Sequence, residues 1–163
     1  MNDPTTYLNP IQPGTILPDF CLVDPKGQSI CLEEIIEENG LIIFFIRGTW
    51  CPVCIRLLTQ VNRIIGQIRN YDTGLVCIAC DTPEAIFAYK ISVEPPLDFP
   101  ILIDSNPSLS KQYGVFDVSH ESPQPALFFA GPDRVIRYVD VSPIFHWYPN
   151  LEHLLEVVKQ HKK

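Results

Sequence analysis

Two cysteines three residues apart, in the segment 50–54 (WCPVC), stand between an apolar run and a helical pattern. Before them, residues 41–46 (LIIFFI) are all apolar, which predicts a strand buried on both faces. After them, apolar residues recur with helical spacing at positions 54, 57, 58, 61, 64, 65 and 68. The cysteine pair is therefore expected where a buried strand ends and an amphipathic helix begins.

This position favours ionisation of the first thiol. Cys51 is expected to cap the helix, with Pro52 at its first position, so that the sulfur lies near unpaired backbone N–H groups and the positive end of the helix dipole. Arg47, at the end of the strand, adds a positive charge that stabilises a thiolate. Cys54 lies about one helical turn further along the same face, within reach of Cys51. We predict that Cys51 is the attacking thiolate and Cys54 the resolving thiol; the alternative is two buried structural cysteines.

The rest of the chain has the pattern of one α/β domain with a mixed sheet. Residues 75–80 are a second buried strand, and the order strand, helix, strand implies a right-handed crossover and parallel pairing. Thr82 is expected to cap another helix. Further elements are two short strands around a turn at 24–27, strands at 99–103, 126–130 and 135–139, a short helix at 107–113, and a last helix capped by Asn150. We expect an N-terminal arm at 1–14 and a single domain at 15–163.

Charge and composition argue against several classes of partner. The 163 residues include 12 Lys or Arg and 19 Asp or Glu, a net charge of −7, which repels nucleic-acid phosphates and anionic membranes. The N-terminus lacks the basic and apolar regions of a signal peptide, and no apolar stretch is long enough for a transmembrane helix. We therefore expect a cytoplasmic protein that binds neither nucleic acid nor membrane. Its six cysteines are then expected to be mostly reduced, which favours catalysis or metal binding over structural disulfides.

Cys77 and Cys80 form a second CxxC pair, and the spacing between the two pairs is close to that of a four-cysteine zinc site. Both residues fall within a predicted strand, however, where side chains three apart point to opposite faces and cannot easily share one ion. We therefore expect no metal and no other cofactor. Cys77 is interpreted as a small buried residue. Cys80 stands at the carboxyl end of its strand, where open α/β sheets place active sites, so an auxiliary redox role is its alternative.

The strand–WCPVC–helix unit is similar to the thioredoxin fold. Together with residues 18–20 (PDF), the turn at 24–27, residues 99–104 (FPILID) and residues 113–115 (YGV), it resembles the alkyl hydroperoxide reductase/thiol-specific antioxidant family, the peroxiredoxin-like proteins. The resemblance covers roughly residues 16 to 140. It implies a thioredoxin-like fold, with a central mixed β-sheet flanked by helices and an N-terminal β-hairpin extension. It also implies cysteine-based reduction of peroxides or disulfides, with an external thiol reductant such as a thioredoxin or glutathione system.

Departures from the family signature leave the order of attack open. Peroxiredoxins carry a Pro-x-x-x-Thr-x-x-Cys motif. When its cysteine is matched to Cys54, Arg47 stands at the proline and Cys51 at the threonine. Where the family's peroxide-binding arginine would be sought, this chain reads SPQPA at 122–126. The resemblance therefore implies an alternative in which Cys54 is the peroxidatic cysteine and attacks first.

Thioredoxin-like proteins also have a cis-proline that faces the dithiol, and Gln124-Pro125 fits its place. A cis peptide there would let the backbone of Gln124 pair with an extended substrate; the alternative is an ordinary trans proline. Trp50, next to the first thiol, is expected to shield it and to contact substrate. Thioredoxins bury an aspartate under the dithiol, and this chain has Phe45 at that position.

Two further segments have alternative interpretations. His120 and Glu121 precede the predicted proline loop, where they are either a proton shuttle or a solvated pair. The aromatic segment 143–148 (PIFHWY) either covers the site, forms a dimer contact or packs the last helix. Taken together, the sequence predicts a thiol-dependent antioxidant oxidoreductase that cycles a Cys51/Cys54 disulfide. A redox-inactive binding module with the same fold is the alternative from another class.

Overall fold

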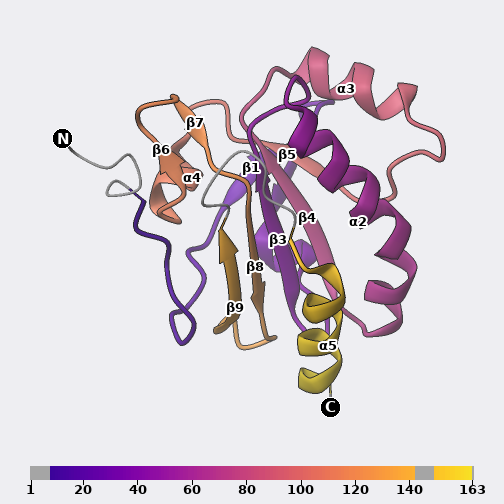
Figure 1. Cartoon of the computed structure of the whole chain (residues 1–163), viewed down its shortest axis with the longest axis vertical. Coiled ribbons are helices and arrows are strands. Elements are labelled where there is room, and N and C mark those ends of the chain that lie inside the picture. The colour runs from indigo at the N-terminus through magenta and orange to yellow at the C-terminus, as the bar shows by residue number, and fades with distance from the viewer. Residues whose placement is uncertain (1–7, 142–148, 163) are drawn as a thin grey trace.

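A seven-stranded mixed sheet forms the centre of the computed structural model, which describes residues 8–141 and 149–162. The strand order is β2-β1-β5-β4-β3-β8-β9 (Figure 1). The neighbours β3, β4 and β5 run parallel, and the remaining pairs are antiparallel. The strands are β1 (Cys21–Val23), β2 (Ser29–Cys31), β3 (Leu41–Ile46), β4 (Gly74–Ala79), β5 (Ile101–Ile103), β8 (Ala126–Ala130) and β9 (Ile136–Val141).

Helices cover both faces of this sheet, as the α/β pattern predicts. They are α1 (Leu32–Ile35), α2 (Pro52–Asn70), α3 (Pro83–Ser92), α4 (Ser108–Gln112) and α5 (Leu151–His161). One apolar cluster joins the sheet to α2, α3 and α5, and a second cluster on the other face includes side chains of α1 and α4. Figure 1 shows α2 and α5 lying side by side against the sheet. The predicted fold class is confirmed.

The two faces of β3 explain why its six residues are all apolar. Phe44 and Ile46 pack in the cluster that holds Cys51 and Cys54. Phe45 lies in the opposite cluster, with its ring centroid 5.2 Å from that of Tyr113. The expectation that Phe45 lies under the dithiol is therefore wrong, because side chains alternate along a strand and the even-numbered positions face α2.

Local signals in the sequence place the helix starts and the first turn correctly. Thr82 Oγ1 accepts a hydrogen bond from the Ala85 N–H at 3.2 Å, and Asn150 Oδ1 accepts one from the His153 N–H at 3.0 Å. Both side chains satisfy N–H groups that a helix start leaves without a partner. The turn at 24–27 is closed by Asp24 Oδ1, which accepts from the N–H groups two and four residues later.

The described part of the predicted arm lies against the end of α4. The Asn9 N–H donates to the Gly114 carbonyl at 3.0 Å, and the Ile11 N–H donates to the Tyr113 carbonyl at 3.2 Å. Gly114 has φ +76°, and a Cβ there would stand 1.8 Å from the Asn9 carbonyl oxygen. Only glycine therefore fits this contact. The boundary between residues 14 and 15 stays a prediction.

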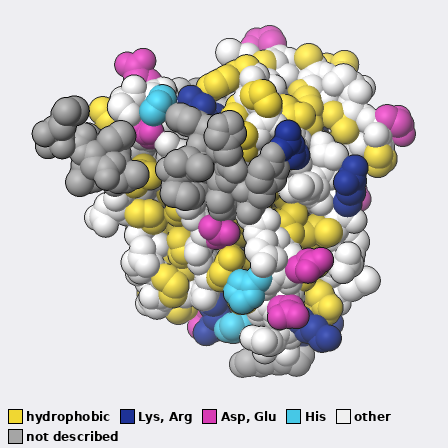
Figure 2. All heavy atoms as spheres, viewed as in Figure 1, with side chains coloured by type: hydrophobic (Ala, Val, Ile, Leu, Met, Phe, Trp, Pro, Cys, Tyr) yellow, Lys and Arg dark blue, Asp and Glu magenta, His cyan; other side chains and the backbone are white. Residues whose placement is uncertain are grey.

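The length of the helices and the distribution of basic side chains are relevant to membrane and nucleic-acid partners, which the sequence analysis did not expect. Among the described helices, none is both long and apolar enough to cross a membrane. Figure 2 shows Lys and Arg side chains scattered on the face in view rather than gathered into one patch.

A small second sheet, which the sequence analysis did not predict, stands near the carboxyl end of β3. It consists of β6 (Phe116–Asp117) and β7 (Ser122–Pro123), paired antiparallel with Asp117 opposite Ser122. Both residues are buried. This β6–β7 hairpin carries polar side chains to the cysteine site.

Candidate active site

The dithiol stands where the sequence places it, at the start of α2. Cys51 is the N-cap, with extended φ −95° and ψ 115°, and Pro52 is the first helical residue. Both Cys51 and Cys54 are free thiols. They are also buried, with exposed fractions of 4% and 0%. A reagent that reaches Cys51 in this conformation must therefore be small.

The pKa values of the two thiols are shifted in opposite directions. The hydrogen bond from the Cys54 side chain is the largest cause that lowers the pKa of Cys51 to about 6, and it outweighs the opposing effect of burial. The positive charge of Arg47 lowers the same pKa further. The same hydrogen bond raises the pKa of Cys54 well above its ordinary value, and burial adds to that effect. One shared proton therefore leaves Cys51 as the thiolate and Cys54 as the thiol.

Arg47 contacts the site through both its backbone and its side chain. Its backbone N–H donates to Cys54 Sγ at 3.2 Å. Its Nε donates to Ser122 Oγ at 2.9 Å, and its guanidinium carbon lies 4.6 Å from the centroid of the Trp50 ring. The Trp50 side chain is 58% exposed. The structure thus brings Arg47, Trp50 and both cysteines together, whereas their chemical roles stay predictions.

The predicted cis-proline is absent. The peptide between Gln124 and Pro125 is trans, and the cis peptide in the described chain is Glu94–Pro95. The Gln124 N–H donates to the Val115 carbonyl at 2.8 Å, so this backbone group is already paired within the protein. The expectation that a cis peptide frees the Gln124 backbone for an extended substrate is therefore wrong. Whether Gln124 and Pro125 contact substrate stays a prediction.

The Gln124 side chain instead joins a buried network around Asp117. Gln124 Nε2 donates to Asp117 Oδ2 at 2.7 Å, and its Oε1 is buried with no hydrogen-bond partner in the described chain. Asp117 also accepts from Ser119 Oγ at 2.6 Å and contacts His120 Nδ1 at 2.7 Å. Burial acts to raise the pKa of Asp117, but these hydrogen bonds outweigh it and lower the pKa to about 2. Glu121 has φ +51° in the turn.

His120 is not a freely solvated side chain, since its ring nitrogen contacts the buried Asp117 carboxylate, and its role as a proton shuttle stays a prediction. Asp117, Ser119 and Ser122 are site residues that the sequence analysis missed. One local signal was available, because Asp and Ser two residues apart form a typical side-chain-to-backbone turn, and the Ser119 N–H does donate to Asp117 Oδ1 at 2.9 Å.

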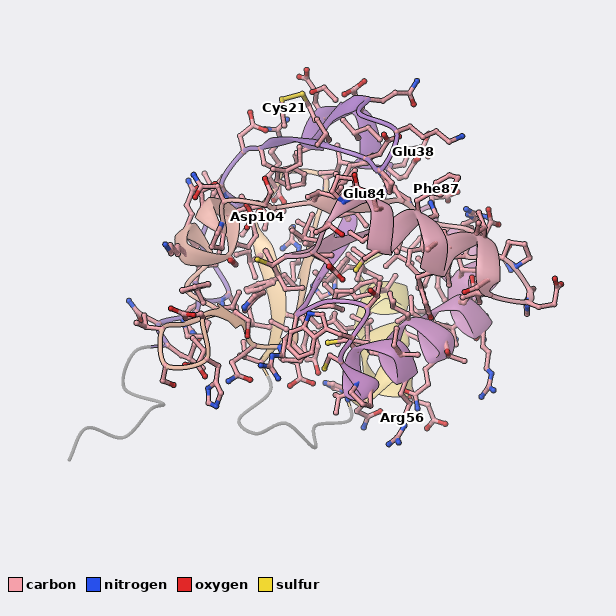
Figure 3. The ribbon with its side chains drawn as sticks, turned by 90° about the horizontal axis from the view of Figure 1, so that it is seen from above. Cys21, Glu38, Arg56, Glu84, Phe87 and Asp104 are labelled. Atoms are coloured by element: carbon pink, nitrogen blue, oxygen red, sulfur yellow. A yellow bond between two sulfur atoms is a disulfide. The ribbon has the colours of Figure 1, made fainter. Side chains whose placement is uncertain are left out.

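Four of the six cysteines are free thiols, which agrees with the expectation of a mostly reduced set, and the remaining two are not. Cys21 and Cys31 face each other across β1 and β2 and form a disulfide with an S–S distance of 1.97 Å. Figure 3 shows the Cys21 disulfide at the edge of the molecule opposite Arg56, which lies in α2. The strands pair Val23 with Ser29 across a five-residue loop at 24–28, and this register sets Cys21 opposite Cys31. A four-residue turn at 24–27 would have set Cys21 opposite Ile30, so the predicted turn alone did not reveal the pairing.

The second CxxC pair lies inside β4 and just beyond it. Cys77 is completely buried, and burial raises its pKa. Cys80 is partly exposed, and burial raises its pKa, with the carboxylates of Asp104 and Asp81 adding to the effect. Among the described residues, no group of three or more His, Cys, Asp or Glu side chains is arranged to hold a metal ion. The aromatic segment 143–148 lies outside the described residues.

Comparison with known proteins decides the family. The model of the AhpC/TSA family matches residues 13–139. This chain belongs to the AhpC/TSA family. Its relatives include the thiol-disulfide oxidoreductase ResA of Halalkalibacterium halodurans, 29% identical over 60% of this chain and 53% of the relative. Peroxiredoxin bcp1 of Schizosaccharomyces pombe is 27% identical over 82% of this chain and 69% of the relative. The chain thus spans about half to two thirds of the length of these relatives.

Solved structures confirm the thioredoxin-like fold predicted for this AhpC/TSA member. The peroxidoxin BcpB structure from Mycobacterium tuberculosis superposes with a TM-score of 0.81 and covers 92% of this chain and 97% of that chain, at 18% identity. The recognition of the family from the WCPVC unit and its surrounding motifs is confirmed. The relatives are named as a thiol-disulfide oxidoreductase and a peroxiredoxin, which are of the class that the sequence predicts for this chain.

Proposed function

We propose that this chain reduces a small oxidised substrate with the Cys51 thiolate and resolves the product with Cys54. One arrangement carries the proposal: Cys51 is the N-cap of α2 and Cys54 lies in its first turn, and the hydrogen bond between them lowers the pKa of Cys51 to about 6 and raises that of Cys54. At neutral pH Cys51 is then mostly ionised and Cys54 keeps its proton. A two-cysteine cycle needs this division between an attacking thiolate and a thiol that reacts second.

With a hydroperoxide, the cycle is a two-electron reduction of the O–O bond. The Cys51 thiolate attacks the terminal oxygen, the O–O bond breaks, and the released alkoxide or hydroxide takes a proton. Cys51 becomes a sulfenic acid. Cys54 then attacks the Cys51 sulfur, water leaves, and a Cys51–Cys54 disulfide forms. An external thiol such as a thioredoxin or glutathione system returns both cysteines to thiols and becomes a disulfide itself.

Burial favours a peroxide over a protein disulfide as the oxidant. Cys51 is only 4% exposed, so a small hydroperoxide reaches it more readily than a folded partner does. Gln124 and Pro125 are kept as candidate substrate contacts on the strength of the sequence. A disulfide substrate is the second candidate, and the relative named as a thiol-disulfide oxidoreductase supports it.

The competing assignment makes Cys54 the first nucleophile. The Arg47 backbone N–H, 3.2 Å from Cys54 Sγ, stabilises negative charge on that sulfur and supports this alternative. The raised pKa of Cys54 and its complete burial count against it. For localisation we keep the cytoplasm as a proposal from the sequence. The Cys21–Cys31 disulfide counts against it, because disulfides persist mainly in oxidising compartments.

Single-cysteine variants with one matched control test these roles. Cys51→Ser should abolish peroxide consumption with an external thiol. Cys54→Ser should retain one peroxide reaction and accumulate a sulfenic acid on Cys51, detected by dimedone labelling and peptide mass spectrometry. Cys80→Ser, which removes a partly exposed thiol outside the pair, should leave the rate unchanged.

Two results separate the alternatives. Rapid sulfenic acid formation on Cys54 in the Cys51→Ser variant would reverse the two roles. Unchanged peroxide and disulfide reduction in both single variants, or no turnover at all in the parent protein, would favour the non-catalytic binding module.

A further inference from the structure

We propose that Ser122 is a positioning residue that holds the Arg47 guanidinium beside the Cys51–Cys54 pair. Ser122 lies in β7, about 70 residues away in sequence, and nothing in the CxxC motif points to it. The inference deepens the proposed function. It rests on that proposal only for the use of the Cys51 thiolate in catalysis.

Among the described residues, Ser122 and Trp50 both contact the Arg47 side chain. Its Nε donates to Ser122 Oγ at 2.9 Å, and its guanidinium carbon stacks 4.6 Å from the Trp50 ring centroid. The backbone of the same residue contacts Cys54 Sγ. One residue therefore touches the resolving sulfur with its peptide group, while its charge acts on the Cys51 sulfur.

Ser122 can anchor the arginine because its own backbone is held in the β6–β7 hairpin. Ser122 is buried, with an exposed fraction of 6%, and it pairs with Asp117 across the hairpin. Asp117 is in turn bound by Ser119, His120 and Gln124. A serine hydroxyl on a flexible loop would move with the arginine, whereas the backbone of Ser122 is held by its pairing with Asp117.

The anchor matters because Coulomb attraction depends on distance and on solvent. An arginine side chain has many rotamers, so a guanidinium that loses an anchoring hydrogen bond spreads over more positions. Positions nearer to water are screened and contribute less to a thiolate. Loss of the Ser122 hydroxyl should therefore raise the pKa of Cys51 even though Ser122 itself carries no charge.

A double-mutant cycle on the full chain tests the path through Arg47. The readout is the pH dependence of Cys51 alkylation by iodoacetamide, resolved by peptide mass spectrometry. Ser122→Ala should shift the midpoint upward by about half a pH unit, which lowers the rate below the midpoint about threefold because reactivity follows the thiolate fraction. In an Arg47→Met background, Ser122→Ala should cause no further shift, since coupled residues are non-additive.

Two matched variants complete the design. Ser122→Thr keeps the hydroxyl and should restore the parent midpoint. Ser92→Ala removes a hydroxyl that donates to the Tyr89 carbonyl in α3, and it should leave the midpoint unchanged. A purely structural role for Ser122 would lower the melting temperature of Ser122→Ala without moving the midpoint, which would overturn the inference. Equal shifts in the parent and Arg47→Met backgrounds would overturn it too.

The result is distinguishable from a failure of the proposed function, because alkylation needs no turnover. If the parent protein reduces neither peroxide nor disulfide and the cycle still shows coupling, the proposed function fails and the positioning role of Ser122 stands.

Discussion

Asp81 and Thr49 are joined by two hydrogen bonds. Asp81 Oδ2 accepts from the Thr49 backbone N–H at 2.9 Å and from the Thr49 hydroxyl at 2.8 Å. Asp81 follows β4, and Thr49 lies in the loop that leads from β3 to Cys51. Gly48 fits between them and the Trp50 ring, since a Cβ there would stand 2.4 Å from Trp50 Nε1 and 3.0 Å from Asp81 Oδ2. The loop that delivers Cys51 is thus tied to the end of the neighbouring strand.

The Asp81→Asn variant should loosen this loop. Hydrogen bonds to a charged acceptor contribute about 1.5–3 kcal/mol, so we expect the free energy of unfolding to fall by about 1–2 kcal/mol, with slower reaction of Cys51 with peroxide. Urea denaturation and stopped-flow peroxide kinetics measure the two effects. Asp98→Asn is the control, because that side chain is 67% exposed in its ion pair with Arg69 and should cost much less. If Asp81→Asn and Asp98→Asn changed stability and peroxide kinetics equally, the hydrogen bonds from Thr49 to Asp81 would not be what holds the loop.

The reactivity of Cys51 should depend on pH with a midpoint at about pH 6. Alkylation requires the thiolate, so the rate should rise as pH increases through this value and level off above it. In Cys54→Ala the largest cause of the lowered pKa is removed, and the midpoint should move toward the ordinary thiol range near 9. Peptide-resolved iodoacetamide kinetics give both midpoints. A parent midpoint near 9 would contradict the assignment of Cys51 as the resting thiolate.

Asp117 should make stability depend on pH in acid. Its pKa falls from 3.8 to about 2 in the folded protein, so the ionised side chain contributes its full stability above about pH 4 and loses it as pH falls through 2. Asp117→Asn should therefore lower the free energy of unfolding at pH 7, by about 1.5–3 kcal/mol for hydrogen bonds to a charged group. The difference from the parent should shrink below pH 3 in urea titrations. A constant difference from pH 2 to pH 7 would show that the Asp117 charge is not the cause.

The Cys21–Cys31 disulfide should stabilise the β1–β2 hairpin mainly by limiting the unfolded chain. The two residues are 10 apart in sequence. The chain-entropy relation then gives a loss of about 2–3 kcal/mol for the Cys21→Ser/Cys31→Ser double variant. Denaturation with and without reductant supplies the check, because reductant should destabilise the parent and leave the double variant unchanged. If reductant destabilised both proteins equally, its effect would come from other thiols.

Most of the fold could be predicted because its signals are local. The apolar run of β3 and the helical spacing in α2 follow from burial alone, and Thr82 and Asn150 mark helix starts through their own side chains. The β6–β7 hairpin gave no such signal. Each of its strands has two residues, too few to show the alternation that identifies a strand.

The site could be predicted only where its residues are neighbours in sequence. Arg47, Cys51 and Cys54 lie in one strand–loop–helix unit, so their proximity follows from the local pattern. Ser122 and Asp81 reach the same site through tertiary pairing, about 75 and 32 residues from their partners. The hydrogen bond from the Gln124 N–H to the Val115 carbonyl is likewise a tertiary contact that only the folded chain makes.

The disulfide at the sheet edge gives the chain more redox states than its CxxC motif alone suggests. Cys21–Cys31 is oxidised in the same structure in which Cys51 and Cys54 are free thiols. Each pair can hold two electrons, so the protein has four combinations of oxidised and reduced pairs. A total thiol count of four describes two of these combinations equally well, one with the outer pair closed and one with the inner pair closed, and only cysteine-by-cysteine assignment tells a resting molecule from one that has just turned over.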